Sequence, residues 1–198
     1  MLLLAAGPPT TPVELAKART YAERFRYEPL DDLTDADARR AIAEAAQPLG
    51  VEWEPDALDR VVSLARGYPF FLQLYASETW DLAAGGEELQ RIGIEHVRAA
   101  EPRVSRRLDN GLYATRYERS SDAERQYLRA IGALMGDEDR SVRSGDVARE
   151  LGKPLSDLSS VRDRLIRKGV IYAPTVGVLR FSVPGFREYI ARRAAGEL

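Results

Sequence analysis

The side chains best suited to bind a ligand lie on one face of a helix predicted for residues 156–168. Leu158, Val161 and Leu165 recur at helical spacing and predict the face that packs inward. The opposite face carries hydroxyl, carboxylate and guanidinium groups: Ser156, Ser160, Asp163 and Arg167, flanked by Ser159 and Arg164. Hydroxyls and arginines donate hydrogen bonds to phosphates and base edges. This face therefore predicts a contact with double-stranded DNA.

Other charged residues near this helix support two different uses for it. Arg180 on a predicted strand and Arg192-Arg193 near the end of the chain could reach the flanking phosphate backbone. Asp157 and Asp163 argue the other way, because carboxylates repel phosphates. A winged helix used for packing or for protein contact, with a merely solvated helix face, therefore stays open as the alternative.

The charge of the chain is distributed unevenly. The 198 residues carry a net charge of −2, but residues 140–198 hold 12 Lys and Arg against 6 Asp and Glu. Residues 1–139 hold 17 basic residues against 25 acidic ones. An acidic body with a basic end is typical of a protein whose end binds a polyanion, although exposed arginines also serve solubility.

Few residues could form a catalytic or metal site. Cysteine is absent and His96 is the sole histidine, which removes the thiolate nucleophile and the usual zinc ligands. A serine triad would need His96 as its base, and its neighbours Ser105 and Asp109 fall together on one ordinary helix by chance. We expect no catalytic residue and no metal site, and we expect His96 on a helix surface.

Residues 121–198 have the element order of a winged helix, that is, a helix-turn-helix followed by a β-hairpin. Ser121 and Glu124 form a capping box, and Tyr127, Leu128, Ile131 and Leu134 predict the buried face of the first helix. Ser144 is expected to cap a short second helix that ends at Gly152. Residues 170–173 and 178–182 predict two strands joined by a turn at residues 174–177, and a closing helix follows Pro184.

Residues 11–120 predict a helical bundle. Thr34 caps a helix with Ala38, Ala41, Ile42 and Ala45 on its apolar side, and Pro55 opens the next helix. A third helix opens at Tyr68-Pro69 and ends at Gly85-Gly86. Residues 94–119 predict a further helix that Pro102 must kink or divide. We therefore place a boundary between two domains near Ser120.

The order of these segments resembles a known family. Residues 2–9, 20–25, 67–73, 165–172 and 181–184 (LLLAAGPP, TYAERF, GYPFFLQ, LIRKGVIY and FSVP) follow one another as in the C-terminal half of a bacterial AAA+ ATP-binding protein. The branch it resembles is that of the STAND and origin-recognition-like ATPases, in which a P-loop core precedes a helical lid and a winged helix. The resemblance covers nearly the whole chain.

The resemblance implies roles for particular residues. Gly67-Tyr68-Pro69 matches the glycine-x-proline motif at the start of the lid helix, whose proline lies against the nucleotide base in the family, so Gly67, Tyr68 and Pro69 are the nucleotide-binding candidates. It also implies that residues 1–10 are a remnant strand of the ATPase core, that 11–120 are the lid and that 121–198 are the winged helix. ATP and magnesium are implied for a full-length relative.

The sequence departs from the family where the phosphates would bind. No GxxxxGK followed by Ser or Thr occurs, and no apolar strand ends in paired carboxylates, so the phosphate cradle and the magnesium ligands are missing. The glycine turn at residues 85–88 offers neither lysine nor hydroxyl. Residues 5–7 offer no polar sensor residue, and no lid arginine stands at the sensor position beside Pro69. The chain thus resembles a truncated or split member whose nucleotide core is missing.

These observations predict a mostly α-helical protein with a lid-type bundle followed by a winged helix. We expect a regulatory portion of an AAA+ or STAND-type protein that binds duplex DNA through Ser156, Ser159, Ser160, Arg164, Arg167 and Arg180. A protein-interaction or nucleotide-state switch without DNA is the alternative, with a protein partner or the missing core as its target. The absence of cysteine and of a membrane-spanning segment predicts a cytoplasmic protein.

Overall fold

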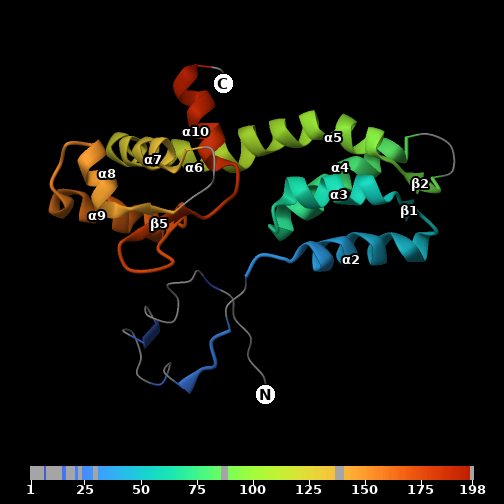
Figure 1. Cartoon of the computed structure of the whole chain (residues 1–198), viewed down its shortest axis with the longest axis horizontal. Helices are drawn as coiled ribbons and strands as arrows, with labels where there is room; N and C mark the ends of the chain where they lie inside the picture. The colour runs from blue at the N-terminus through green and yellow to red at the C-terminus, as the bar shows by residue number, and fades with distance from the viewer. Residues whose placement is uncertain are drawn as a thin grey trace.

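The computed structural model describes residues 7, 15–16, 21, 24–28, 31–85, 89–136 and 141–196. Within these ranges the chain forms two lobes that one run of helical residues connects (Figure 1). We call residues 31–107 the helical lobe and residues 122–196 the winged-helix lobe. The remnant strand expected at residues 1–10 lies outside the described residues except for residue 7, and so do residues 86–88 of the glycine turn.

The helical lobe contains four α-helices and a two-stranded sheet among the described residues. The helices are α2 (Asp35–Ala46), α3 (Pro55–Ala65), α4 (Pro69–Ala83) and α5 (Ile94–Arg107), and a 3-10 turn, η2 (Gln47–Leu49), follows α2. Strands β1 (Glu52–Trp53) and β2 (Arg91–Ile92) pair in parallel, with Trp53 opposite Ile92.

Local chemistry fixes where these helices begin. Thr34 caps α2 by accepting the N–H of Asp37 at 3.1 Å, as predicted. Pro55 and Pro69 occupy the first positions of α3 and α4, where the missing N–H costs no hydrogen bond. Two alanines of the predicted apolar face of α2 are exposed, Ala41 and Ala45, and the buried face is Ala38, Ile42 and Ala46 instead.

A π-helical turn joins the lobes. Helix α5 passes through Pro102 without a break, so the prediction that this proline divides the helix is wrong. Pro102 is exposed, and so is Arg98, the residue whose carbonyl loses its intrahelical donor. The irregularity comes later, at η3 (Leu108–Tyr113), where the helix widens and continues as α6 (Ala114–Glu118).

The winged-helix lobe has the predicted order of elements. Helices α7 (Asp122–Met135), α8 (Ser144–Glu150) and α9 (Leu155–Arg167) precede strands β4 (Ile171–Tyr172) and β5 (Val178–Phe181), and α10 (Phe186–Ala195) closes the lobe. A two-residue strand that we did not predict, β3 (Val142–Arg143), pairs antiparallel with β5 and completes a sheet of order β3-β5-β4. The mostly helical fold with a lid-type bundle and a winged helix is thus confirmed.

Two local expectations in this lobe are wrong. Ser144 is the first residue of α8 rather than its cap, and Arg143 holds the cap position without a side-chain hydrogen bond. Leu134 is exposed, because the buried face of α7 turns toward Ala130 and Met135 instead. The capping box of Ser121 and Glu124 at the start of α7 is confirmed.

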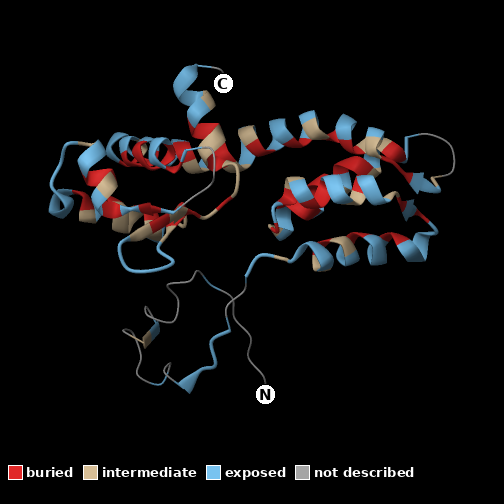
Figure 2. Cartoon of the chain, in the orientation of Figure 1, coloured by how far each residue is buried: buried red, intermediate tan, exposed pale blue. Residues whose placement is uncertain are grey.

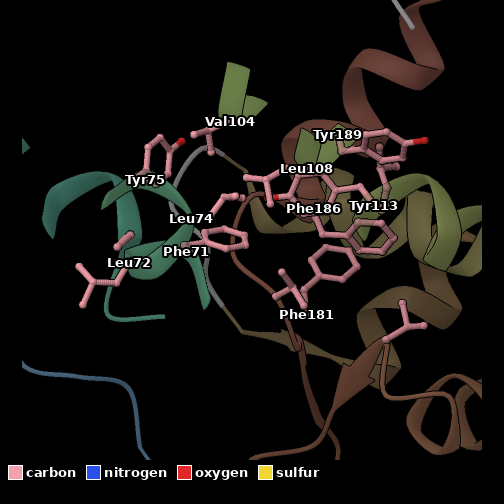
Figure 3. Close-up of a cluster of buried hydrophobic side chains, with 14 of the residues drawn as sticks. Phe71, Leu72, Leu74, Tyr75, Val104, Leu108, Tyr113, Phe181, Phe186 and Tyr189 are labelled. Atoms are coloured by element: carbon pink, nitrogen blue, oxygen red, sulfur yellow. The ribbon is translucent and has the colours of Figure 1, made fainter. Parts of the chain in front are cut away.

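Aromatic side chains from both lobes meet at the junction. We call Phe71, Tyr113, Phe181, Phe186 and Tyr189 the interlobe aromatic cluster (Figure 3). Ring centroids lie 6.4 Å apart for Phe71 and Tyr113, 5.5 Å for Tyr113 and Tyr189, and 5.5 Å for Phe181 and Phe186. These separations are typical of stabilising aromatic pairs. Buried residues therefore continue from one lobe into the other (Figure 2).

Polar contacts fix the same junction. The Tyr113 hydroxyl donates a 2.7 Å hydrogen bond to the Pro184 carbonyl, and burial raises the pKa of Tyr113. Arg66 at the end of α3 lies 3.2 Å from Glu188 of α10, and Arg192 lies 2.5 Å from Asp109 of η3. Among the described helices, none is long and apolar enough to cross a bilayer.

We predict that Gly185→Ala will lower the free energy of unfolding by about 2 kcal/mol, measured by urea denaturation. Gly185 has φ +76°, and a Cβ there would lie 2.4 Å from the Tyr113 hydroxyl oxygen. The matched control is Gly145→Ala in α8, where a Cβ meets no atom within 4 Å. Because alanine favours a helix over glycine, this variant should raise the free energy of unfolding by about 0.5 to 1 kcal/mol. Equal stability of the two variants would contradict the described junction.

Candidate DNA-contact face and apolar groove

Helix α9 presents the face that the sequence predicted. Leu158, Val161 and Leu165 are buried, which confirms the inner face of the helix. Ser156, Ser160 and Arg167 are exposed on the other side. The helix runs from Leu155 to Arg167, and Lys168 is its C-terminal cap. These bounds are close to the predicted ones. The elements that hold α9 in place are α7 and α8, which pack against its inner side.

The small hydroxyls of this face are already partly hydrogen-bonded within the helix. Ser159 donates to the Ser156 carbonyl at 2.7 Å, and Ser156 donates to the Asp157 carboxylate at 3.0 Å. Their remaining lone pairs and a rotatable O–H still suit contact with a phosphate or base edge. Asp163 is paired with Arg162 at 2.9 Å, which reduces the repulsion that this carboxylate would exert on a phosphate.

A buried carboxylate engages two of the cations near the end of α9. Glu124 of α7 has a side chain only 1% exposed and accepts hydrogen bonds from Lys168 at 2.6 Å and Arg164 at 3.3 Å. The backbone N–H of Ser121 donates to it at 2.7 Å, and Lys168 also donates to the Arg119 carbonyl at 2.9 Å. Arg164 and Lys168 therefore hold α9 against the start of α7, a role that the capping box alone did not indicate.

The pKa of Glu124 follows from these contacts. Burial is the largest effect and by itself raises the pKa of the carboxyl, because desolvation disfavours its charged form. The hydrogen bonds and charge of Lys168, the Ser121 N–H and Arg164 together outweigh burial and hold the pKa below its ordinary value. Glu124 therefore stays ionised, so that Lys168 and Arg164 both have a negatively charged partner.

Two cations remain uncommitted at this face. In the described part of the chain, Lys153 and Arg167 are exposed and make no side-chain ion pair or hydrogen bond. Arg180 lies on β5 opposite Tyr172 and is half-buried. The turn at residues 174–177 carries no basic residue, and Val176 at its tip is fully exposed. Positive charge for a phosphate contact thus comes from α9 and its preceding loop rather than from the wing.

A second candidate site is an apolar groove in the helical lobe with a volume of about 470 Å³. It lies between α2 and α4, and most of its lining is apolar: Leu33, Ala41, Ile42, Ala45, Ala46, Leu49, Trp53, Pro69, Leu72, Gln73, Ala76, Ser77 and Trp80. The exposed Ala41 and Ala45, which did not fit the predicted core, form part of its wall. Concave apolar surfaces with few polar groups are typical of sites for small ligands.

The three nucleotide-binding candidates occupy different places around this groove. Pro69 lines it. Tyr68 packs edge-on against Phe71, with ring centroids 5.1 Å apart. Gly67 has φ +75°, and a Cβ there would lie 2.8 Å from the Leu33 carbonyl oxygen. Its own carbonyl accepts the N–H of Leu33 at 2.8 Å, so Gly67 brings the segment before α2 against the start of α4. Gly67 therefore shapes the groove, and Pro69 forms its surface.

His96 lies where the sequence placed it, near a helix surface. It is the third residue of α5, and its Nδ1 accepts the backbone N–H of Gly93 at 3.1 Å. Among the described residues, no group of three or more His, Asp or Glu side chains is placed to hold a metal ion.

Comparisons with known proteins give the following matches. A family model described as a domain of unknown function, DUF8462, matches residues 110–190. No curated protein matches the sequence. Among solved structures, a mutant of Thermotoga maritima RuvB is 19% identical with a TM-score of 0.41, over 88% of this chain and 53% of that chain.

Two further solved structures are similar at the same level. Thermotoga maritima RuvB, described as a Holliday junction branch migration motor, is 19% identical with a TM-score of 0.36, over 84% of this chain and 50% of its own. Aeropyrum pernix ORC1 in complex with DNA is 18% identical with a TM-score of 0.40, over 85% and 50%. The chain spans about half the length of these structures.

We predict that Glu124→Gln will lower the free energy of unfolding by about 1 to 3 kcal/mol at pH 7, because Lys168 and Arg164 lose their charged partner. Since the pKa of Glu124 is lower in the folded state, its contribution is complete above the unfolded value of about 4.3 and is lost as the pH falls further. Urea denaturation between pH 7 and pH 3 should therefore show the difference from wild type shrinking.

The control for this series is Glu150→Gln, at an exposed position at the end of α8. Its difference from wild type should be small at pH 7. If Glu124→Gln and Glu150→Gln behaved alike across the pH range, Glu124 would not be the residue that anchors α9.

Proposed function

We propose that this chain is the lid and winged-helix part of an AAA+-type ATP-binding protein of the STAND and origin-recognition-like branch, and that its winged helix binds duplex DNA through α9. The observation that carries the DNA proposal is the outer face of α9. It combines the exposed Ser156, Ser160 and Arg167 with an uncommitted Lys153 beside it. Small donors and cations on one helix face suit a helix that lies along a DNA groove.

The nucleotide part of the proposal is supported by the groove between α2 and α4. Pro69, from the motif that resembles the family's glycine-x-proline segment, forms part of its wall, and Trp53 and Trp80 line it as well. A flat apolar base suits such a surface. The residues fit the base and not the triphosphate, because the sequence has no phosphate loop and no apolar strand that ends in paired carboxylates for magnesium. We therefore assign no hydrolytic step to this chain.

A switch module without DNA is the second candidate. It is supported by the junction of the lobes, where the interlobe aromatic cluster and Arg66–Glu188 tie α10 to the helical lobe and Arg192–Asp109 ties it to η3. A winged helix held this firmly could report the state of the helical lobe to a protein partner. The DNA titration described next separates the two candidates.

We predict that the full chain binds a labelled 20-base-pair duplex and that the logarithm of affinity falls linearly with the logarithm of salt concentration. Lys153→Gln/Arg167→Gln should weaken binding and make this slope shallower by about 2, one unit for each lost phosphate contact. Arg164 is left intact because it stabilises Glu124. Fluorescence anisotropy between 50 and 200 mM salt measures both quantities.

The matched control is Arg39→Gln/Arg40→Gln on α2, which removes the same charge from arginines that pair with Asp59 and Asp37. The control should bind as wild type does. No binding at low salt, or equal loss in both double variants, would reject α9 as the contact surface and favour the switch module.

We also predict that adenosine monophosphate binds the groove weakly, with a dissociation constant of about 1 mM, and quenches tryptophan fluorescence. The chain has two tryptophans and both line the groove, so its intrinsic emission reports on this site. Ala45→Glu places a charged side chain in the wall and should abolish the quenching. Ala36→Glu, at an exposed position of the same helix outside the groove, should leave it unchanged. Identical titrations of both variants would show that adenosine monophosphate does not bind in the groove.

A further inference from the structure

Three arginines stand exposed on the outer side of α5. They are Arg98, Arg103 and Arg106, and within the described ranges none of them makes a side-chain ion pair or hydrogen bond. We call these three residues the α5 arginine row. By contrast, Arg162, Arg164 and Lys168 on and next to α9 all pair with acids. The helical lobe therefore offers more uncommitted arginines on one helix than the winged-helix lobe offers on α9.

The acids near the α5 arginine row are directed elsewhere. Glu101 binds Arg60 of α3 through hydrogen bonds of 2.8 and 2.7 Å, and Asp109 binds Arg192 of α10. Glu78 of α4 accepts from Arg107. Glu101 and Glu78 thus join α5 to α3 and α4, Asp109 joins η3 to α10, and Glu95 of α5 lies 3.2 Å from His96. None of these acids binds an arginine of the row, which leaves a positive outer surface between Arg98 and Arg106.

The spacing of the row suits a regular array of charges. At 100° and 1.5 Å per residue, the three arginines fall within about 140° around α5 and span about 12 Å along it. Phosphates follow one another every 3.4 Å of axis along each strand of a duplex, so about 12 Å covers three or four of them. Guanidinium groups bind phosphate oxygens in pairs, and three such contacts need no rearrangement of the helix.

We propose that the α5 arginine row is a second contact surface for the phosphate backbone of duplex DNA, separate from α9. A duplex suits the row better than a single strand, because α5 contains no Phe, Tyr or Trp on which unpaired bases could stack. In Figure 1, α5 runs along the upper edge of the molecule, and α9 lies below α7 on the lower side of the other lobe. The row therefore contacts a part of the DNA that α9 does not cover.

The inference rests on the proposed function in one respect, that duplex DNA is the ligand. The test compares the full chain, Arg98→Gln/Arg103→Gln/Arg106→Gln, Lys153→Gln/Arg167→Gln and the combination of all five substitutions, on a labelled 40-base-pair duplex. The matched control is Arg39→Gln/Arg40→Gln/Arg149→Gln, which removes one half-buried and two exposed arginines that pair with Asp59, Asp37 and Asp146. Circular dichroism and urea denaturation check that each variant is folded.

We expect the α5 triple variant to bind at least about tenfold more weakly than the control at 50 mM salt, with a salt slope shallower by about 2 to 3. We expect the losses from the α5 and α9 substitutions to add in the combined variant, because the surfaces are separate. If the α5 triple variant binds more weakly while the α9 variant binds as wild type does, the α5 arginine row is supported as a DNA contact and the assignment to α9 is rejected. If the triple variant matches its control while the α9 variant loses affinity, the row is overturned and the proposed function stands. Absence of binding by the wild-type chain overturns both.

Discussion

The hydrogen bond from Tyr113 to the Pro184 carbonyl is the contact on which the arrangement of the two lobes depends. Tyr113 comes from the π-helical turn η3, and Pro184 precedes α10, so this one bond joins the link between the lobes to the helix that closes the fold. The ring of Tyr113 lies between Phe71 of the helical lobe and Phe186 and Tyr189 of α10. Because the hydroxyl is buried, losing its partner would leave a polar group unsatisfied in an apolar cluster. Gly185 is needed at this point since the chain passes too close to Tyr113 to carry a Cβ.

Most of the acidic groups described above pair with a cation of another element, whereas several basic groups remain exposed at the surface. Glu124, Asp109, Glu101 and Glu188 each bind a cation from another element, so the acids mainly set how the helices pack. Glu124 does so from a fully buried position and holds the end of α9 to the start of α7. Lys153 and Arg167 on one side and the α5 arginine row on the other are among the cations that remain exposed and unpaired in the described chain. Net charge alone, which is nearly balanced, does not reveal this division.

Local signals in the sequence predicted most of the elements, and tertiary contacts explain what they missed. Capping residues and prolines marked the starts of α2, α3, α4 and α7, and helical spacing identified the buried side of α9. Strand β3 was missed because two residues carry no periodic pattern, and it exists through pairing with β5 far along the chain. A kink or a division was predicted at Pro102, where the helix does not divide, and the π-helical turn forms later at η3, where Leu108 and Tyr113 are both buried. The DNA contact predicted for Arg164 stays a prediction, and its bond to Glu124 could not be foreseen because the spacing of α9 gives no sign of a residue 40 positions earlier.

The groove and the winged-helix lobe are connected through the first turn of α4. Pro69 forms part of the groove wall, and Phe71, two residues later, reaches the interlobe aromatic cluster on the other side of the helix. A hydrogen-bonded helical turn moves as a unit, so a ligand that displaced Pro69 would also displace Phe71 against Tyr113. Tyr113 in turn holds Pro184 and therefore the start of α10. The groove wall and the start of α10 are then joined by one chain of packed side chains. A ligand in the groove can change the equilibrium between two arrangements of the lobes only by the difference in its binding free energy for the two. The junction that fixes the start of α10 is therefore in packing contact, through one turn of α4, with the wall of the groove.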